Sequence, residues 1–163
     1  MNLTTTRTKS VCMIVTVDLH NASNGYPIPL RKNFKLWATA TMTMLAPEHK
    51  QQQLCIRIVD EEESAALNHQ YRHKTGATNI LSFPVPAQLL AANVLGDLAI
   101  CAALVEREAT AQHKTLDAHW AHLTIHGVLH LNGFDHEEAK DAARMEELEI
   151  KILAELGYKD PYQ

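Results

Sequence analysis

The chain has 163 residues, of which 46% are hydrophobic and 21% charged, and its formal net charge is −4. These values suit a globular chain that buries its own core, and they argue against a general nucleic-acid coat protein, which needs a strong basic excess. No apolar run reaches the roughly 20 residues that a membrane-spanning helix needs, so we expect no membrane partner.

The N-terminus and the cysteines both bear on where the protein works. Residues 1–10 contain basic residues without a following apolar stretch, so no secretory signal is expected. Cys12, Cys55 and Cys101 are odd in number, widely spaced and without a CxxC pattern, which predicts reduced, buried thiols in a cytoplasmic protein. We expect one domain over residues 1–163, with 1–10 as a disordered tail.

The predicted elements follow from the spacing of apolar residues along the chain. β-branched and apolar runs predict strands, and apolar residues at helical period predict helices. Asp60, followed by three glutamates, is typical of a helix N-terminus. In chain order we expect a strand at 11–19, a helix at 30–45, a strand at 54–59, a helix from 60 to about 71, strands at 79–84 and 95–101, and helices at about 102–113, 117–131 and 137–156. This order predicts a small mixed sheet of about four strands packed with about five helices.

The run HGVLHLNGFDH at residues 126–136 carries the clearest chemistry. His126 and His130 are four residues apart on a predicted helix, so their imidazoles lie on one face. Gly133 stands where a chain leaving a helix often adopts positive φ, and the turn it permits can bring His136 to the same ion. Three neutral imidazoles leave a fourth tetrahedral position open for water, which is typical of catalytic rather than structural zinc. We therefore predict one Zn²⁺ per chain, on a C-terminal helix and the turn after it.

Other histidines and another enzyme class compete with this interpretation. His122 and His126 are also four apart, but the glycine turn and third histidine follow His130, so we interpret His119 and His122 as helix-surface or supporting residues rather than ligands. The spacing H-x3-H-x2-G-x2-H is also the ligand frame of metzincin proteases, whose first histidine is followed by a glutamate base. Gly127 stands at that position here, and Met145 falls in a regular helix rather than a methionine turn. A metzincin-like protease lacking the usual glutamate is one alternative.

The same run resembles the signature H-G-x-L-H-L-x-G-[YF]-D-H of the YbeY family, bacterial metal-dependent endoribonucleases also described as rRNA maturation factors. Four further segments are similar to family segments in the same order: RIVDEEESAALN (57–68), NHQYRHKTGATNILSFP (68–84), LGDLAIC (95–101) and ELEIKILAELGY (147–158). The likeness covers about residues 54–163 closely and the N-terminal strand and helix loosely.

The resemblance implies a function, a cofactor and a set of site residues. It places the zinc ligands of the family on His126, His130 and His136, and its functionally important arginine on Arg72. It implies an α+β fold and cleavage of single-stranded RNA, in maturation of the 3′ end of 16S rRNA and late quality control of ribosomes. The expected partners are 16S rRNA, small ribosomal subunit proteins and assembly factors, in the bacterial cytoplasm.

Neighbouring side chains fit a phosphodiester substrate. A planar guanidinium at Arg72 can bind two non-bridging phosphate oxygens at once. His73 and Lys74 are further candidate RNA contacts. Asp135 either orients a histidine ligand or caps the following helix, and both interpretations stay open. The nucleophile and the general base also stay open, and a zinc-stabilised ribosome-assembly factor without catalysis is a second alternative.

Overall fold

The computed structural model describes residues 12–45, 51–86, 88 and 93–163. The expectation of a disordered tail at residues 1–10 lies outside this part of the chain. Among the described helices, none is both long and apolar enough to cross a membrane.

Four strands and five helices make up the described chain, and they confirm the predicted α+β class. The strands are β1 (Val15–Asn21), β2 (Gln52–Val59), β3 (Ile80–Pro84) and β4 (Val94–Cys101). The helices are α1 (Arg31–Leu45), α2 (Glu61–Arg72), α3 (Ala102–Ala111), α4 (Leu116–Leu131) and α5 (Ala139–Glu155). The clearest difference from the predicted bounds is in β1, which begins at Val15 rather than at residue 11.

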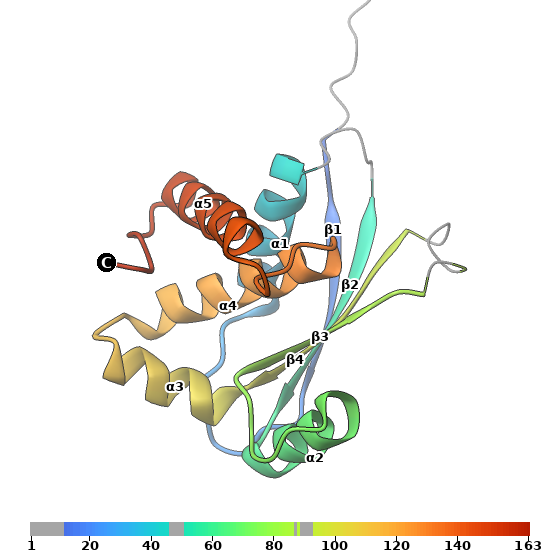
Figure 1. Cartoon of the computed structure of the whole chain (residues 1–163), viewed down its shortest axis with the longest axis vertical. Coiled ribbons are helices and arrows are strands. Elements are labelled where there is room, and N and C mark those ends of the chain that lie inside the picture. The colour runs from blue at the N-terminus through green and yellow to red at the C-terminus, as the bar shows by residue number, and fades with distance from the viewer. Residues whose placement is uncertain (1–11, 46–50, 87, 89–92) are drawn as a thin grey trace, which may run out of the picture.

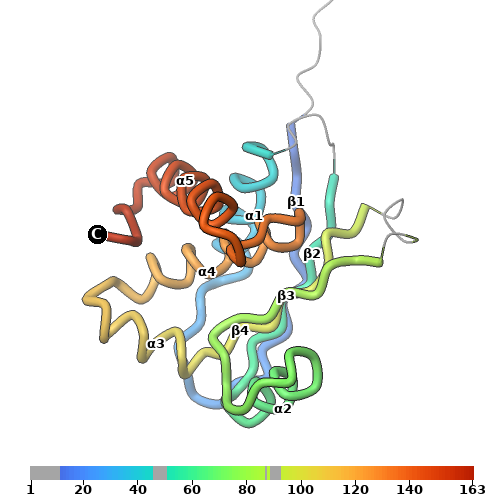
Figure 2. Tube along the Cα trace, viewed as in Figure 1, coloured from blue at the N-terminus to red at the C-terminus, as the bar shows by residue number. Residues whose placement is uncertain are grey.

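The sheet has the order β1-β2-β4-β3, with β1, β2 and β4 parallel and β3 antiparallel to β4. β1 and β3 are therefore its two edge strands. α1 and α4 pack on one face of the sheet with α5 stacked outside them, whereas α2 lies against the other face near the ends of β2 and β4 (Figure 1). The Cα trace shows α4 running between α5 and the sheet, so this helix is covered from several sides (Figure 2).

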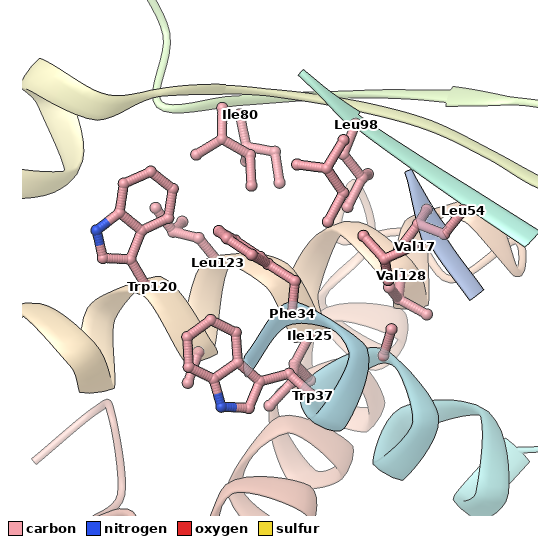
Figure 3. Packing of buried hydrophobic residues seen from close by; sticks show 14 of the residues in the cluster. Val17, Phe34, Trp37, Leu54, Ile80, Leu98, Trp120, Leu123, Ile125 and Val128 are labelled. Atoms are coloured by element: carbon pink, nitrogen blue, oxygen red, sulfur yellow. The ribbon is translucent and has the colours of Figure 1, made fainter. Parts of the chain in front are cut away.

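Side-chain alternation in the strands and an apolar stripe on α1 build the core between helices and sheet. On β1 the buried Val15 and Val17 alternate with exposed residues, the period-two pattern of a strand with one covered face. Figure 3 shows side chains of α1, α4 and the strands meeting in this space. Phe34 lies edge-on to both Trp37 and Trp120, with ring centroids 5.4 and 5.7 Å apart. Burial of each large apolar side chain stabilises the fold by about 1.5–3 kcal/mol and thereby holds α4 in place.

The expectation of three buried thiols is only partly right. Cys101 is buried, Cys55 is half-buried and Cys12 is exposed, and all three are free. Cys55 is accessible because it faces the side of β2 that α1 and α4 leave uncovered, whereas the next residue, Ile56, enters the core.

Candidate metal centre

α4 carries two of the predicted histidine ligands. Thr115 caps this helix by accepting a hydrogen bond from the backbone N–H of Ala118 at 3.2 Å. One helical turn then separates His126 from His130, and their ring centroids lie 4.6 Å apart. The two Nε2 atoms face each other at 3.1 Å. Both imidazoles therefore lie on one face of the helix.

A glycine turn ends α4 and sends the chain back toward the same two rings. Gly133 has a φ of +87°, the positive value expected from the sequence. Its N–H donates to the carbonyl of His130 at 3.0 Å, and the N–H of Phe134 donates to that of Leu129 at 3.2 Å. These two bonds form a Schellman motif, which reverses the chain within a few residues. His136 follows in the connection between α4 and α5.

The three histidines converge and leave one side open. The ring centroid of His136 lies 5.0 Å from that of His130 and 5.7 Å from that of His126. One nitrogen of each ring lies within 4.8 Å of the others, so the group can hold a metal ion. Among the described residues, no fourth histidine, cysteine or carboxylate joins this group. Structural zinc sites are almost always closed by a fourth protein ligand, whereas catalytic sites keep a position open.

The spacing and protonation of the imidazoles suit a divalent transition metal. Two nitrogens bound tetrahedrally to zinc at about 2.0–2.1 Å lie roughly 3.3 Å from each other, close to the 3.1 Å between the rings of His126 and His130. Burial, followed by the charges of His126 and His136, lowers the pKa of His130 to about 4. His130 is then neutral at neutral pH, which is the form that binds a metal.

Glu149 of α5 is wholly buried and contacts two histidines of α4. Its Oε1 lies 2.6 Å from Nδ1 of His126, and its Oε2 lies 3.2 Å from Nε2 of His122. The hydroxyl of Tyr162 donates to the same Oε2. A carboxylate beside Nδ1 keeps the proton of His126 on that atom, so the lone pair of Nε2 is free for a metal.

Hydrogen bonding outweighs burial in setting the charge of Glu149. Burial alone raises the pKa of this carboxyl, but the hydrogen bonds from His122 and His126 and the charges of both rings bring it down to about 2. Glu149 is not among the residues predicted from the sequence, although it shares the buried face of α5 with Met145 and Ile152. A carboxylate that falls within the apolar stripe of a helix is rarely buried without a partner. The place of Glu149 in that stripe is therefore the sequence signal that could have identified this residue.

The other two histidines of α4 support the site rather than extend it. The sequence left two interpretations open for these residues, helix-surface or supporting. His119 is buried, so it is not a surface residue, and His122 contacts Glu149. The Nε2 atom of His119 lies 2.8 Å from Oε2 of Glu108, whose two oxygens also accept from Nδ2 of Asn79 at 3.2 and 3.1 Å. Burial raises the pKa of Glu108, but these bonds outweigh it and leave the pKa lowered. They tie α4 to α3 and to the start of β3.

A cavity of about 550 Å³ adjoins the histidine cluster. His130 and His136 line it together with Arg72, Lys74 and Ser82. Arg72, the last residue of α2, and Lys74 are both exposed, and neither forms an ion pair within the described part of the chain. Two cations near a metal position, each without a carboxylate partner, are suited to binding phosphate.

Hydrogen bonds from two buried side chains hold the segment that follows α2. The hydroxyl of Ser64 donates to the carbonyl of Thr78 at 2.7 Å and accepts from the N–H of Thr78 at 2.9 Å. The Nδ2 atom of Asn68 donates to the carbonyl of Gly76 at 2.8 Å. Because both side chains belong to α2, they bind this segment to the helix that ends at Arg72.

The remaining predicted residues have distinct places. His73 ends α2 in the left-handed conformation, with a φ of 56°, and does not line the cavity. Asp135 does line it, as does Glu137. The Oδ1 atom of Asp135 accepts from the N–H of His136 at 2.6 Å and lies 4.0 Å from Nδ1 of that ring. The N-cap of α5 is Glu138, which makes no side-chain cap bond, so Asp135 does not cap that helix.

Gly127 follows His126 on the face of α4 that touches the sheet. A Cβ atom there would lie 2.7 Å from Cδ1 of Ile80 and 2.8 Å from Cδ2 of Leu98. A glutamate here, the base that metzincin proteases use, would therefore displace these core side chains. Met145 lies inside the regular helix α5, as expected. Neither feature of the proteolytic machinery is present at these two positions.

Comparisons with a family profile and with individual proteins point to the same family. The profile of the family described as Endoribonuclease YbeY matches residues 19–157. The chain is similar to the endoribonuclease YbeY of Coxiella burnetii, with 46% identity over 151 residues, which cover 92% of this chain and 99% of that protein. It is also similar to the endoribonuclease YbeY of Pseudomonas putida, with 61% identity over 112 residues, 68% of this chain and 71% of that protein.

Among solved structures, the solution structure of TM1509 from Thermotoga maritima matches the fold. The TM-score is 0.56 at 22% sequence identity, and the match covers 86% of this chain and 91% of that one. The likeness shows that the arrangement of helices and strands is shared.

Proposed function

The chain belongs to the YbeY family of endoribonucleases, and from this premise we propose that it is a zinc-dependent enzyme that cleaves single-stranded RNA. The observation that carries the proposal is the histidine cluster with an open side, next to a cavity that Arg72 also lines. The proposed substrate is 16S rRNA, at the stage of 3′-end maturation and late quality control of ribosomes, in the cytoplasm. Small ribosomal subunit proteins and assembly factors are the proposed partners.

The histidine cluster is the proposed zinc site, with His126, His130 and His136 as ligands. Zinc bound there supplies Lewis-acid chemistry, which polarises phosphate oxygens and lowers the pKa of water toward neutrality. Glu149 orients the cluster because its Oε1 holds the proton of Nδ1 of His126 at 2.6 Å. The buried carboxylate is itself held by Tyr162 and does not face the cavity, so it orients a ligand and does not abstract a proton from the substrate.

Arg72 and Lys74 are the proposed phosphate-binding residues. Cleavage of a phosphodiester builds negative charge on the non-bridging oxygens, and a planar guanidinium donates to two of them at once. Lys74 adds a point charge on the same cavity. Because these side chains reach the cavity from the end of α2, and the histidines reach it from α4 and the turn after it, a phosphate bound between them contacts both groups.

Two observations weigh against the alternatives. Gly127 has no side chain that could act as the base of a protease, so we expect no digestion of casein. A zinc site that only stabilises the fold is expected to close with a fourth protein ligand, which the described residues around the cluster do not provide. Cleavage of a phosphodiester therefore remains the function that the site supports best.

Cleavage of a fluorescent single-stranded RNA by purified variants tests the proposal. We expect Arg72→Ala to slow cleavage by about a hundredfold or more, because a donor to the developing charge is lost. Arg31→Ala, which removes an exposed arginine at the start of α1, is the matched control and keeps the full rate. If folded Arg72→Ala cleaves RNA at the full rate, Arg72 does not have the proposed role in cleavage.

A further inference from the structure

A second group of metal-ligating side chains lies on the face of the sheet that α1 and α4 leave uncovered. It consists of Asp18 and His20 on β1 and Cys55 on β2, and one ligand atom of each lies within 4.8 Å of the others. Asp18 and His20 point to the same face because they are two residues apart on a strand. Cys55 joins them because β1 and β2 are parallel and pair Asp18 with Cys55.

Asp18 and His20 already contact each other and are open to solvent. The Oδ2 atom of Asp18 lies 3.0 Å from Nε2 of His20, and the two side chains are 58% and 56% exposed. Cys55 is half-buried and free. On its other side, Cys55 is paired with Asp97 of β4, so a second carboxylate is next in the same row across the sheet. The cluster therefore combines sulfur, nitrogen and oxygen donors.

The charges around the cluster favour a bound cation. The nearest positive side chain on β2, Arg57, is occupied elsewhere: its Nε and Nη2 donate to the two oxygens of Glu63 at 2.6 and 3.2 Å. Burial, then the carboxylates of Asp97 and Asp18, raise the pKa of the Cys55 thiol, and Arg57 lowers it. The two carboxylates thus place negative potential at the sulfur, and a cation there relieves the repulsion that a thiolate would meet.

We propose that Asp18, His20 and Cys55 form a second metal site of the zinc type. Thiolate and imidazole ligands select transition metals such as zinc over magnesium or calcium, which prefer oxygen alone. β1 is an edge strand of the sheet, and a metal shared by β1 and β2 ties this edge to the interior (Figure 1). This site lies on the opposite face of the sheet from α4, and it does not depend on the proposed cleavage of RNA.

Cobalt(II) titration under reducing, oxygen-free conditions tests the proposal. A thiolate bound to cobalt gives a charge-transfer band in the near ultraviolet, and the histidine cluster contains no sulfur, so the band reports on a cysteine ligand and not on that cluster. We expect the band in the wild-type protein and its loss in Cys55→Ser. Cys12→Ser, which removes an exposed thiol outside the cluster, is the matched control and keeps the band. His20→Gln weakens cobalt binding by about tenfold or more.

Variants of the histidine cluster separate the two sites. His130→Ala retains the cobalt band in full, and zinc still raises its Tm because ligand binding to the folded state stabilises it. In the double variant His130→Ala, Cys55→Ser that rise is lost. The proposal is overturned if the wild-type protein shows no band, if the band survives Cys55→Ser, or if it saturates only at millimolar cobalt. Circular dichroism confirms folding, and His20→Gln, an exposed change, keeps the test decisive if Cys55→Ser unfolds.

Discussion

The carboxylate of Glu149, wholly buried on α5, lies 2.6 Å from Nδ1 of His126 on α4. An ionised carboxylate in the interior costs several kcal/mol unless donors surround it. Here His126, His122 and Tyr162 all contact its oxygens. The arrangement couples the outermost helix to a metal ligand, so a change on α5 should be felt at the metal centre.

The first prediction concerns Glu149→Gln. Loss of the negative charge makes His126 a weaker ligand, and we expect zinc affinity to fall by about 10–100-fold, measured by competition with a chromophoric chelator. Glu147→Gln, an exposed change on the same helix, is the control and should leave affinity unchanged. Equal affinities for the wild-type protein and Glu149→Gln would show that this carboxylate does not tune the ligand.

The second prediction concerns the turn after α4. Gly133 has a φ of +87°, a backbone conformation that is unfavourable for a residue with a Cβ atom. Gly133→Ala should therefore destabilise the protein by about 1–2 kcal/mol. For a chain of this size that lowers the Tm by roughly 2–4 °C per kcal/mol. Gly133→Asn should cost less, because asparagine tolerates the left-handed region. A higher Tm for the alanine variant in thermal unfolding would mean that the turn does not need this conformation.

The third prediction concerns Gly127, whose Cβ would collide with Ile80 and Leu98. Gly127→Glu should unfold the protein or destabilise it by about 3 kcal/mol or more in urea titration, because overpacking and a buried charge act together. It should not create protease activity. Ala143→Glu, on the exposed side of α5, is the control and should remain as stable as the wild-type protein. A stable Gly127→Glu protein that digests casein would revive the protease alternative.

The fourth prediction is the pH dependence of stability in the metal-free protein. The pKa of His130 is lowered to about 4 from the usual 6.5, so its contribution is complete above about pH 6.5 and is lost as the pH falls toward 4. The pKa of Glu149 is lowered to about 2 from the usual 4.5, so its contribution is lost between about pH 4.5 and 2.

Urea unfolding of the chelated protein at a series of pH values measures both windows. The free energy of unfolding should fall continuously from neutral pH into acid. His130→Ala should flatten the upper window and Glu149→Gln the lower one. Constant stability of the wild-type protein from neutral pH to about pH 4 would contradict the assigned protonation states.

The histidine cluster could be predicted from the sequence because its geometry is local. His126, His130 and His136 come from one helix and the turn after it, and a positive φ at Gly133 suffices to bring them together. The cap of α2 was equally local: Asp60 accepts from the N–H of Glu63 at 2.8 Å, as its position before a run of glutamates predicts.

Features that depend on tertiary packing escaped prediction. Glu149 reaches His126 from a separate helix, and no spacing rule connects the two residues. The burial of His119 depends on α3 lying beside α4, because Glu108 of α3 contacts the ring of His119. The accessibility of Cys55 depends on which face of the sheet the helices cover. The order of the elements along the chain does not determine that face.

Zinc titration into metal-stripped Cys55→Ser protein, with cleavage of single-stranded RNA measured at each step, tests the central claim most directly. In this variant the histidine cluster is the remaining described metal group. We predict no cleavage by the stripped protein, recovery in proportion to added zinc up to about one equivalent per chain, and no recovery in the same protein carrying His130→Ala. Stripped protein that cuts RNA as fast as the zinc-loaded form would contradict the account.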